Sequence, residues 1–457
     1  MNPNRIRQPA NKDISMMNAK PDLLNPGLRT RCLIFGSVAL CLCFAGFYSE
    51  PVRGEEPFRP EVGKFPPLEK AYKYRGELVF VDHPNRRGSI RVQASGMFFR
   101  NDPHPVAMLP YAEIRYHNAP ADLRDIPLGT VLHVYAFLPP DPKTSAVPVL
   151  PVNNKAIDGN HNRGAGIAPA ENHVLLLEDE VSHCLREGKI WKLKEIEMQK
   201  SEGMVVATCE SKAGEDPAQN SETQAQEEKL TFDGATRIWR GKERLEVADL
   251  VAEGVWPASG KKSLEGLAVQ LGITWKPTPD GIFTRFHVSD IWLDEASIQH
   301  AARHQAEVHK AFIRTRWMPA FVDAVEYGKF GRATVTATLF GGMDPALYAD
   351  FQNGASAMMN AAENTLKHAG GSYGPAHMAS RGTILEVNSS PQPPVGSSGI
   401  QIRFETDLII EGIRPGRVVR VRPGNWTLVD IPREEYLGDG SLNHEDRFPT
   451  PAIFPKY

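Results

Sequence analysis

The sequence predicts a mainly β protein made of tandem small β-barrels, with one or two added amphipathic helices and an N-terminal signal or anchor helix. Three observations support this fold class. The chain has 457 residues with 38 glycines and 37 prolines, an excess typical of short elements joined by turns. Segments that alternate apolar and polar residues recur, as half-buried strands do. A glycine-centred turn pattern also recurs along the chain.

The composition bounds the function before any motif is considered. Hydrophobic residues make up 41% of the chain, which is enough for packed cores, and the formal net charge is −3. A near-neutral chain has no general electrostatic attraction for nucleic acid or anionic membranes. Nucleic acid is therefore not an expected partner, and no motif predicts a cofactor.

The N-terminus carries an export signal. Residues 1–31 form a basic leader, and residues 32–48 (CLIFGSVALCLCFAGFY) are apolar or small throughout. Positive charge before an apolar run places the N-terminus in the cytoplasm. Because the run has the minimum length for a membrane span, the segment is predicted to be either a transmembrane anchor or a cleaved signal peptide. Val52 and Gly54 would supply the small residues of a cleavage site before Glu55.

This signal predicts an extracytoplasmic protein. With the segment uncleaved, the chain would be anchored in the inner membrane with its N-terminus in the cytoplasm. After cleavage it would be periplasmic or secreted.

The first barrel unit is predicted over residues 74–138, after a Pro-, Glu- and Lys-rich spacer at 49–73. Within it, the alternating segments GELVFVD (76–82) and SIRVQA (89–94) flank a basic turn, as in a hairpin. Residues 139–172 are irregular and rich in Pro, Gly and Asn, so we expect a linker or a long loop there.

The second barrel unit is predicted over residues 173–293. It contains an acidic stretch without aromatic residues at 211–228, which we expect to be a disordered hairpin tip. A helix follows at 294–315, because Ile298 and Val308 belong to an apolar set at helical spacing and Asp294 or Glu295 stands near its start.

The third barrel unit is predicted over residues 316–437, with a tail at 438–457. A second helix is expected at 355–369, where Met358 and Leu366 recur at mixed three- and four-residue spacing and two glycines follow. This unit is thus expected to be a barrel with helical additions.

A repeated turn supports the tandem arrangement. In each copy an aliphatic residue enters a turn, a glycine supplies backbone freedom, and an alternating strand can leave it. Chance recurrence of common turn chemistry is the alternative. The copies are Ile114 with Asp125, Ile126 and Gly129; Ile238 with Asp249, Leu250 and Gly254; and Gly412 to Gly416 followed by RVVRV.

The chain resembles a class of large exported bacterial proteins of unknown function. The resemblance lies in the phrases GELVFVD, NHVLLLEDE, MPAFVDAVE, TVTATLFGGMDPALY and EGIRPGRVVRV. It implies repeated OB-like or SH3-like β-barrel units over most of residues 74–437, together with export. It supplies no catalytic residues.

Two cysteines remain outside the apolar run, Cys184 and Cys209. In an oxidising compartment they would form a disulfide, and the alternative is a pair of buried free thiols.

A transition-metal site is one hypothesis for the predicted helix at 294–315. His300, His304 and Glu307 stand at i, i+4 and i+7, so they could face one direction. The alternative is a solvated polar face.

An anion site is the second hypothesis. Arg417, Arg420 and Arg422 lie close to Trp426, and a strand would place Arg420 and Arg422 on one face. Such a stripe could engage an anionic envelope polymer. The alternative is an ordinary charged face of a half-buried strand.

No local catalytic motif emerges from the sequence. We therefore expect an exported, non-enzymatic β-repeat protein that acts by binding or as a structural component of the cell envelope. Its expected partners are the membrane, if the N-terminal segment is uncleaved, and an anionic envelope polymer or another envelope protein. The alternatives are a hydrolase of envelope or extracellular polymers and an OB-like nucleic-acid-binding protein.

Overall fold

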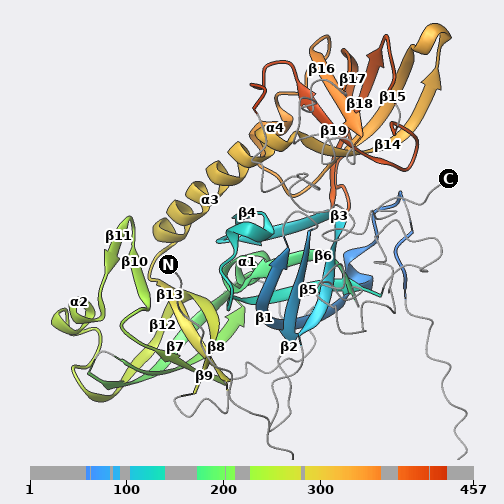
Figure 1. Cartoon of the computed structure of the whole chain (residues 1–457). Helices are drawn as coiled ribbons and strands as arrows, with labels where there is room; N and C mark the ends of the chain where they lie inside the picture. Colours follow the sequence, from blue (N-terminus) through green and yellow to red (C-terminus); the bar gives the residue numbers. More distant parts are fainter. Residues whose placement is uncertain are drawn as a thin grey trace, which may run out of the picture. The chain divides into compact units, whose positions relative to one another are not determined.

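The computed structural model is mainly β, with three sheets joined by short helices and one long helix (Figure 1). The predicted class of small β-barrels with helical additions is confirmed at this level. The predicted leader (1–31), apolar run (32–48) and tail (438–457) lie outside the described residues. The structure describes residues 58–61, 63–82, 86–92, 103–138, 172–200, 202–211, 227–278, 284–361, 379–410 and 412–429.

The first barrel closes through five strands, with one short strand added. Three consecutive strands, β1 to β3, are antiparallel neighbours, β6 runs parallel to β3, and β5 joins β6 back to β1. Leu78, Ile90 and Leu132 lie fully buried in its core. The elements are η1 (Leu68–Lys70), β1 (Tyr72–Asp82), β2 (Arg87–Val92), β3 (His104–Tyr116), β4 (Ala119–Pro120), η2 (Leu123–Asp125), β5 (Val131–Phe137) and β6 (Asn172–Asp179).

The predicted boundary between the first two barrels is wrong. Strand β6 lies in the segment assigned to the second unit (173–293), yet it pairs with β3 and β5 of the first barrel. Every residue of β6 after Asn172 is buried, as expected for a strand covered on both faces. Residues 139–171, outside the described part, therefore connect two strands of one barrel and are not a linker between barrels.

The second sheet repeats the strand order of the first. Strands β7 to β9 are consecutive neighbours, β13 is parallel to β9 through the pair His287 and Thr231, and β12 joins β13 to β7. Residues 211–228 connect antiparallel neighbours, as predicted, although 212–226 lie outside the described residues. The elements are α1 (Glu180–Arg186), β7 (Lys189–Gln199), β8 (Glu202–Ser211), β9 (Glu227–Phe232), β10 (Arg237–Arg240), β11 (Glu243–Leu245), α2 (Val247–Ala252), β12 (Gly260–Pro277) and β13 (Thr284–Trp292).

The third barrel is a closed ring of six antiparallel strands, in the order β14-β15-β18-β17-β16-β19. Its core includes Met318, Phe404 and Val421. It differs from the first two barrels, because each of its neighbouring strand pairs is antiparallel. The elements are β14 (Met318–Tyr327), η5 (Lys329–Gly331), β15 (Ala333–Phe340), α4 (Pro345–Tyr348), β16 (Ser356–Ala361), β17 (Ser380–Ser389), β18 (Ser397–Thr406) and β19 (Val418–Pro423).

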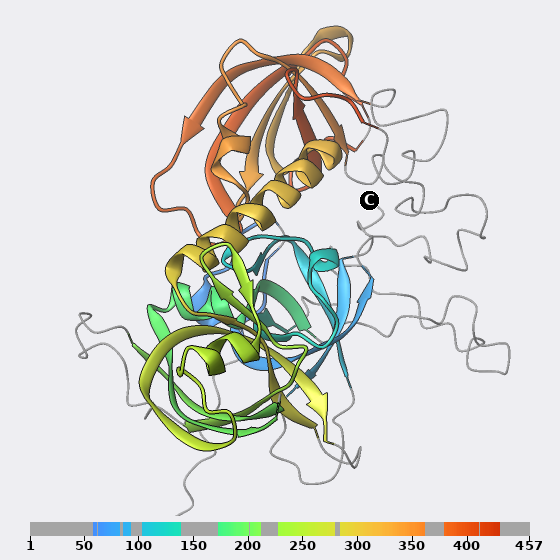
Figure 2. The same ribbon diagram turned by 90° about the vertical axis from the view of Figure 1, so that its left-hand side faces the viewer.

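The helix predicted at 294–315 is confirmed as α3 (Glu295–Arg316), which leads from β13 to β14 (Figure 2). Asp294 caps it by accepting a hydrogen bond from the Ser297 amide at 2.7 Å. More than three turns further along α3, His309 is 4% exposed, and burial lowers the pKa of this imidazole to about 4.

The helix predicted at 355–369 is wrong where the structure describes it. Residues 356–361 form β16, which pairs with β17 and β19. Ala357 and Met359 face the core while Met358 is only half-buried, a two-residue period. A short apolar run fits either period locally, and here closure of the barrel decides it. Residues 362–369 lie outside the described part.

Each barrel bends its first strand with the same irregularity. The pairing of the first and second strands shifts register between Leu78 and Phe80, between Leu193 and Glu195, and between Val322 and Ala324. Such bulges increase strand twist and help a sheet to curl into a barrel.

The repeated glycine turn is structurally equivalent in the first and third barrels. Gly129 donates from its amide to the Leu78 carbonyl at 2.8 Å, and Gly416 donates to the Val322 carbonyl at 2.8 Å. Both glycines have positive φ, of 91° and 75°, which favours glycine. Gly254 differs, because it ends α2 and precedes β12 by several residues.

Aromatic rings join the first and third barrels. Tyr111 lies 5.5 Å from Phe321 and 6.0 Å from Phe340, measured between ring centroids. Phe65 completes the cluster at 4.9 Å from Tyr111. Phe65 belongs to the segment predicted as a spacer (49–73), so the end of that segment is packed and not a free spacer.

We predict that Phe321→Ala lowers the free energy of unfolding by about 3–5 kcal/mol, because the change leaves a cavity between two barrels. Phe330→Ala is the matched control, since Phe330 is 97% exposed and surface changes cost about 0.5 kcal/mol or less. Urea unfolding curves of both variants provide the measurement. Equal losses of unfolding free energy in the two variants would contradict a packed aromatic contact between the first and third barrels.

We also predict that His309 makes the protein less stable as the pH falls from about 6.5 to about 4. Its folded pKa lies below the unfolded value, so the unfolded chain binds the proton first and stability is lost in that interval. The loss reaches about 3 kcal/mol at the lower end. His309→Gln should remove this share of the loss in urea titrations at several pH values, whereas His300→Gln, on an exposed residue, should leave the profile unchanged.

Candidate functional site

A buried polar junction lies where the first barrel meets the second. Asp179, the last residue of β6, caps α1 by accepting a hydrogen bond from the Ser182 amide at 3.0 Å. The start of α1 is thereby fixed directly after a buried strand. This places Glu180, His183 and Cys184 among the strands of both barrels.

Glu180 is the centre of this junction and is 3% exposed. One carboxylate oxygen, Oε2, lies 2.9 Å from a guanidinium nitrogen of Arg75 and 2.8 Å from Nε2 of His133. The other, Oε1, accepts a hydrogen bond from the Trp191 indole at 3.2 Å. Burial opposes ionisation, but Arg75 and His133 outweigh it and hold the pKa of Glu180 well below its usual range.

Arg75 extends the network from the first barrel into the second. Its guanidinium lies 2.8 Å from the Glu228 carboxylate on β9 and 4.6 Å from the ring centroid of Phe286 on β13. A guanidinium suits this position, because it can pair with carboxylates and stack on an aromatic face. Arg75, a side chain of β1, therefore contacts β9, β13 and α1.

A second buried carboxylate stands two residues before Glu180 in the chain. Glu178 is fully buried and accepts three hydrogen bonds from Arg186, at 2.8 and 2.9 Å from Nε and at 2.8 Å from Nη2. The imidazole rings of His133 and His183 stack at 3.7 Å. Burial lowers the pKa of His133, although Glu180 opposes this.

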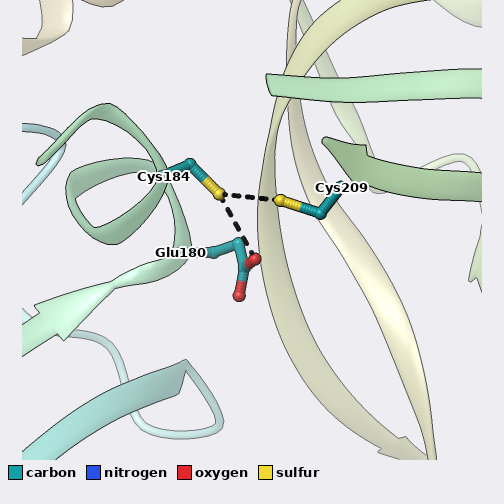
Figure 3. Close-up of side chains that lie close together, drawn as sticks. All are labelled: Glu180, Cys184 and Cys209. Carbon is teal, nitrogen blue, oxygen red and sulfur yellow. Dashed lines mark hydrogen bonds between the residues drawn. The ribbon is translucent and has the colours of Figure 1, made fainter. Parts of the chain in front are cut away.

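The structure brings the two predicted cysteines together as thiols. Their sulfur atoms are 3.6 Å apart, and the Cys184 sulfur is 3.6 Å from Oε1 of Glu180 (Figure 3). Cys184 is buried on α1, and Cys209 is partly exposed on β8. The neighbouring thiol and burial raise the pKa of Cys184 above its ordinary value. A disulfide between them stays a prediction.

The metal site predicted on α3 is not assembled. His300, His304 and Glu307 are all exposed, and Glu307 pairs with Lys310 at 2.6 Å. Among the described residues, the metal-ligating atoms that gather within 4.8 Å of one another are those of Glu180, Cys184 and Cys209. Helical spacing put the histidines on one side, but that side faces solvent.

The residues of the predicted anion site are largely covered in the structure. Trp426 is a buried part of the third core and donates a hydrogen bond to Asp350 at 2.8 Å. Arg420 donates to the Trp317 carbonyl at 3.2 Å, and burial lowers the pKa of Arg420 to about 10. Arg417 is 9% exposed.

The alternation predicted for this strand is nevertheless observed. Val419 and Val421 face the core, and Arg420 and Arg422 alternate with them along the strand. Arg422 donates to the Met358 sulfur on the neighbouring strand at 3.5 Å. Packing against the rest of the chain therefore covers much of a face that a strand period alone would leave in solvent.

Sequence reasoning missed the junction around Glu180. Its signal was the acidic run of residues 178–180 directly after the apolar segment HVLLL, because carboxylates next to a buried strand need partners. The partners of Glu180 lie far from it along the chain or belong to other elements; they are Arg75, His133 and Trp191.

Comparisons of the chain with protein-family models, curated proteins and solved structures found no match.

Within the described residues, no helix combines the length and the apolar character needed to cross a membrane.

We predict that Glu180→Gln lowers the free energy of unfolding by about 3–5 kcal/mol, because Arg75 would keep a buried charge without its carboxylate. Glu187→Gln removes one carboxylate from the other end of the same helix, where the side chain is 33% exposed and pairs with Arg186, and should cost about 1 kcal/mol or less. Chemical denaturation followed by tryptophan fluorescence measures both, with Trp191 as the local reporter. If Glu180→Gln lowers the free energy of unfolding no more than the control does, the view that Glu180 holds the two barrels together is contradicted.

Proposed function

We propose that this chain is an extracytoplasmic, non-enzymatic β-barrel protein that acts by binding or as a structural component of the cell envelope. The basic leader before the apolar run at 32–48 supports export. The protein is then either anchored in the inner membrane or released after cleavage.

The observation that carries this proposal is the pairing within the buried junction. Glu180 is in contact with Arg75, His133 and Trp191, and Glu178 is engaged by Arg186. A general acid or base must reach a substrate, whereas these carboxylates are turned toward protein partners and are at most 3% exposed. The junction therefore fits the role of holding two barrels together.

The strand order supports OB-like units for the first two barrels. Each has a three-strand meander, a fourth strand beside the first, and a fifth strand parallel to the third. OB-folds are five-stranded Greek-key barrels that serve as binding modules. The third barrel, with six antiparallel strands, is a separate type of unit.

Exposed apolar side chains on the third barrel support a binding role. Phe330, at the β14–β15 hairpin tip, is 97% exposed, while Tyr327 and Leu408 are 66% and 65% exposed. Gly331 connects the two segments, because its carbonyl accepts a hydrogen bond from Ile409. Gathered exposed apolar side chains are typical of interaction surfaces.

Cell fractionation and N-terminal sequencing of a C-terminally tagged full chain test the location. We expect the chain in the envelope or outside the cell, with an intact N-terminus if it is anchored or with Glu55 first if it is cleaved after Gly54. Replacing Leu42 and Phe44 with arginine should retain the chain in the cytoplasm, whereas the same change at Leu23 and Leu24, before the apolar run, should not. A wild-type chain found in the cytosol with an intact N-terminus would contradict the proposal.

A further inference from the structure

Three potential ligand atoms converge beside the junction. They are the sulfur atoms of Cys184 and Cys209 and a carboxylate oxygen of Glu180, and all lie within 4.8 Å of one another. Figure 3 shows both thiol side chains and the carboxylate directed toward a common point, with two ligands from α1 and one from β8. Thiolates and carboxylates together are a recognised donor set for zinc.

Two of the three separations among these atoms match a tetrahedral zinc centre, and the third is below 4.8 Å. Zinc–sulfur bonds of about 2.3 Å at tetrahedral angles place two sulfurs about 3.8 Å apart, and a sulfur and an oxygen about 3.5 Å apart. The observed separations are 3.6 Å between the sulfurs and 3.6 Å between the Cys184 sulfur and Oε1 of Glu180. A disulfide would instead need the sulfurs to approach to about 2.05 Å.

The surroundings hold the carboxylate as an oriented ligand. Trp191 donates to Oε1, while Arg75 and His133 engage Oε2. Partners of this kind orient a ligand and tune its affinity. The charges also suit a divalent ion, because two thiolates and a carboxylate bring three negative charges, and Arg75 already supplies one positive charge.

We propose that Glu180, Cys184 and Cys209 form a binding site for zinc or a similar thiophilic divalent cation, which fastens α1 to the second barrel. Binding would release the two thiol protons to solvent and form two metal–sulfur bonds and one metal–oxygen bond, with no change in oxidation state. The fourth position would be left to water, on the side of the partly exposed Cys209. This site does not depend on the proposed location or binding role.

Metal analysis of the full chain, purified with a phosphine reductant and dialysed against zinc, tests the site. We expect one zinc ion per chain, and Co²⁺ in its place should give sulfur-to-cobalt charge-transfer absorption. Cys209→Ser should weaken metal binding by at least about tenfold and remove most of that absorption. Because Cys209 is partly exposed, this variant should keep its fold, and circular dichroism checks that it does.

Two controls separate this site from the other candidates in the chain. A variant with Cys32, Cys41 and Cys43 replaced by serine should keep its zinc, as should His300→Ala on α3. Zinc retained by both Cys184→Ser and Cys209→Ser would overturn the proposal. A wild-type chain that binds no zinc under these conditions would also overturn it. So would a Cys184–Cys209 disulfide in the peptide map of a chain isolated without reductant, if zinc supplied during folding does not prevent that disulfide.

Discussion

The Glu180 carboxylate loses its hydration where α1 enters the space between the first two barrels, and the surrounding chain replaces that hydration. Arg75 comes from β1, His133 from β5 and Trp191 from β7, so the three partners belong to both barrels. A charge buried in this way is tolerated only while its partners stay in place. The contact between the two barrels thus depends in part on this side chain, and the two cysteines lie beside it.

The three barrels share the way in which their first strand is bent. All three barrels bend the first strand with a bulge, and the first and third hold that strand through a turn glycine, Gly129 or Gly416. Closing a small barrel requires sharp local bending, which bulges and glycines with positive φ supply. The number and direction of the strands can still differ between barrels, as they do in the third barrel. Similar turn sequences therefore do not imply identical barrels.

Short-range patterns were a reliable guide where the local period matched the burial. The helix at 294–315 has a capping aspartate and a long periodic stretch, and it forms as α3. At 355–369 the same reasoning failed, because Met358 and Met359 fit either period and the neighbouring strands selected β16. For the candidate sites, the sequence singled out Cys184 and Cys209 as a disulfide or a pair of thiols. The histidines of α3 form the solvated face that was the alternative to a metal site, and Trp426 is a core residue.

By itself the sequence determined the mainly β class, the long helix, the turn glycines and the expectation of export, because each follows from residues close together along the chain. Only the tertiary structure decided that β6 completes the first barrel, that Arg420 is covered, and that Glu180 meets Arg75 and the two thiols. These outcomes depend on which strands become neighbours when a sheet closes. The partners are separated by up to 105 residues in the case of Glu180 and Arg75, and local patterns carry no record of such pairings.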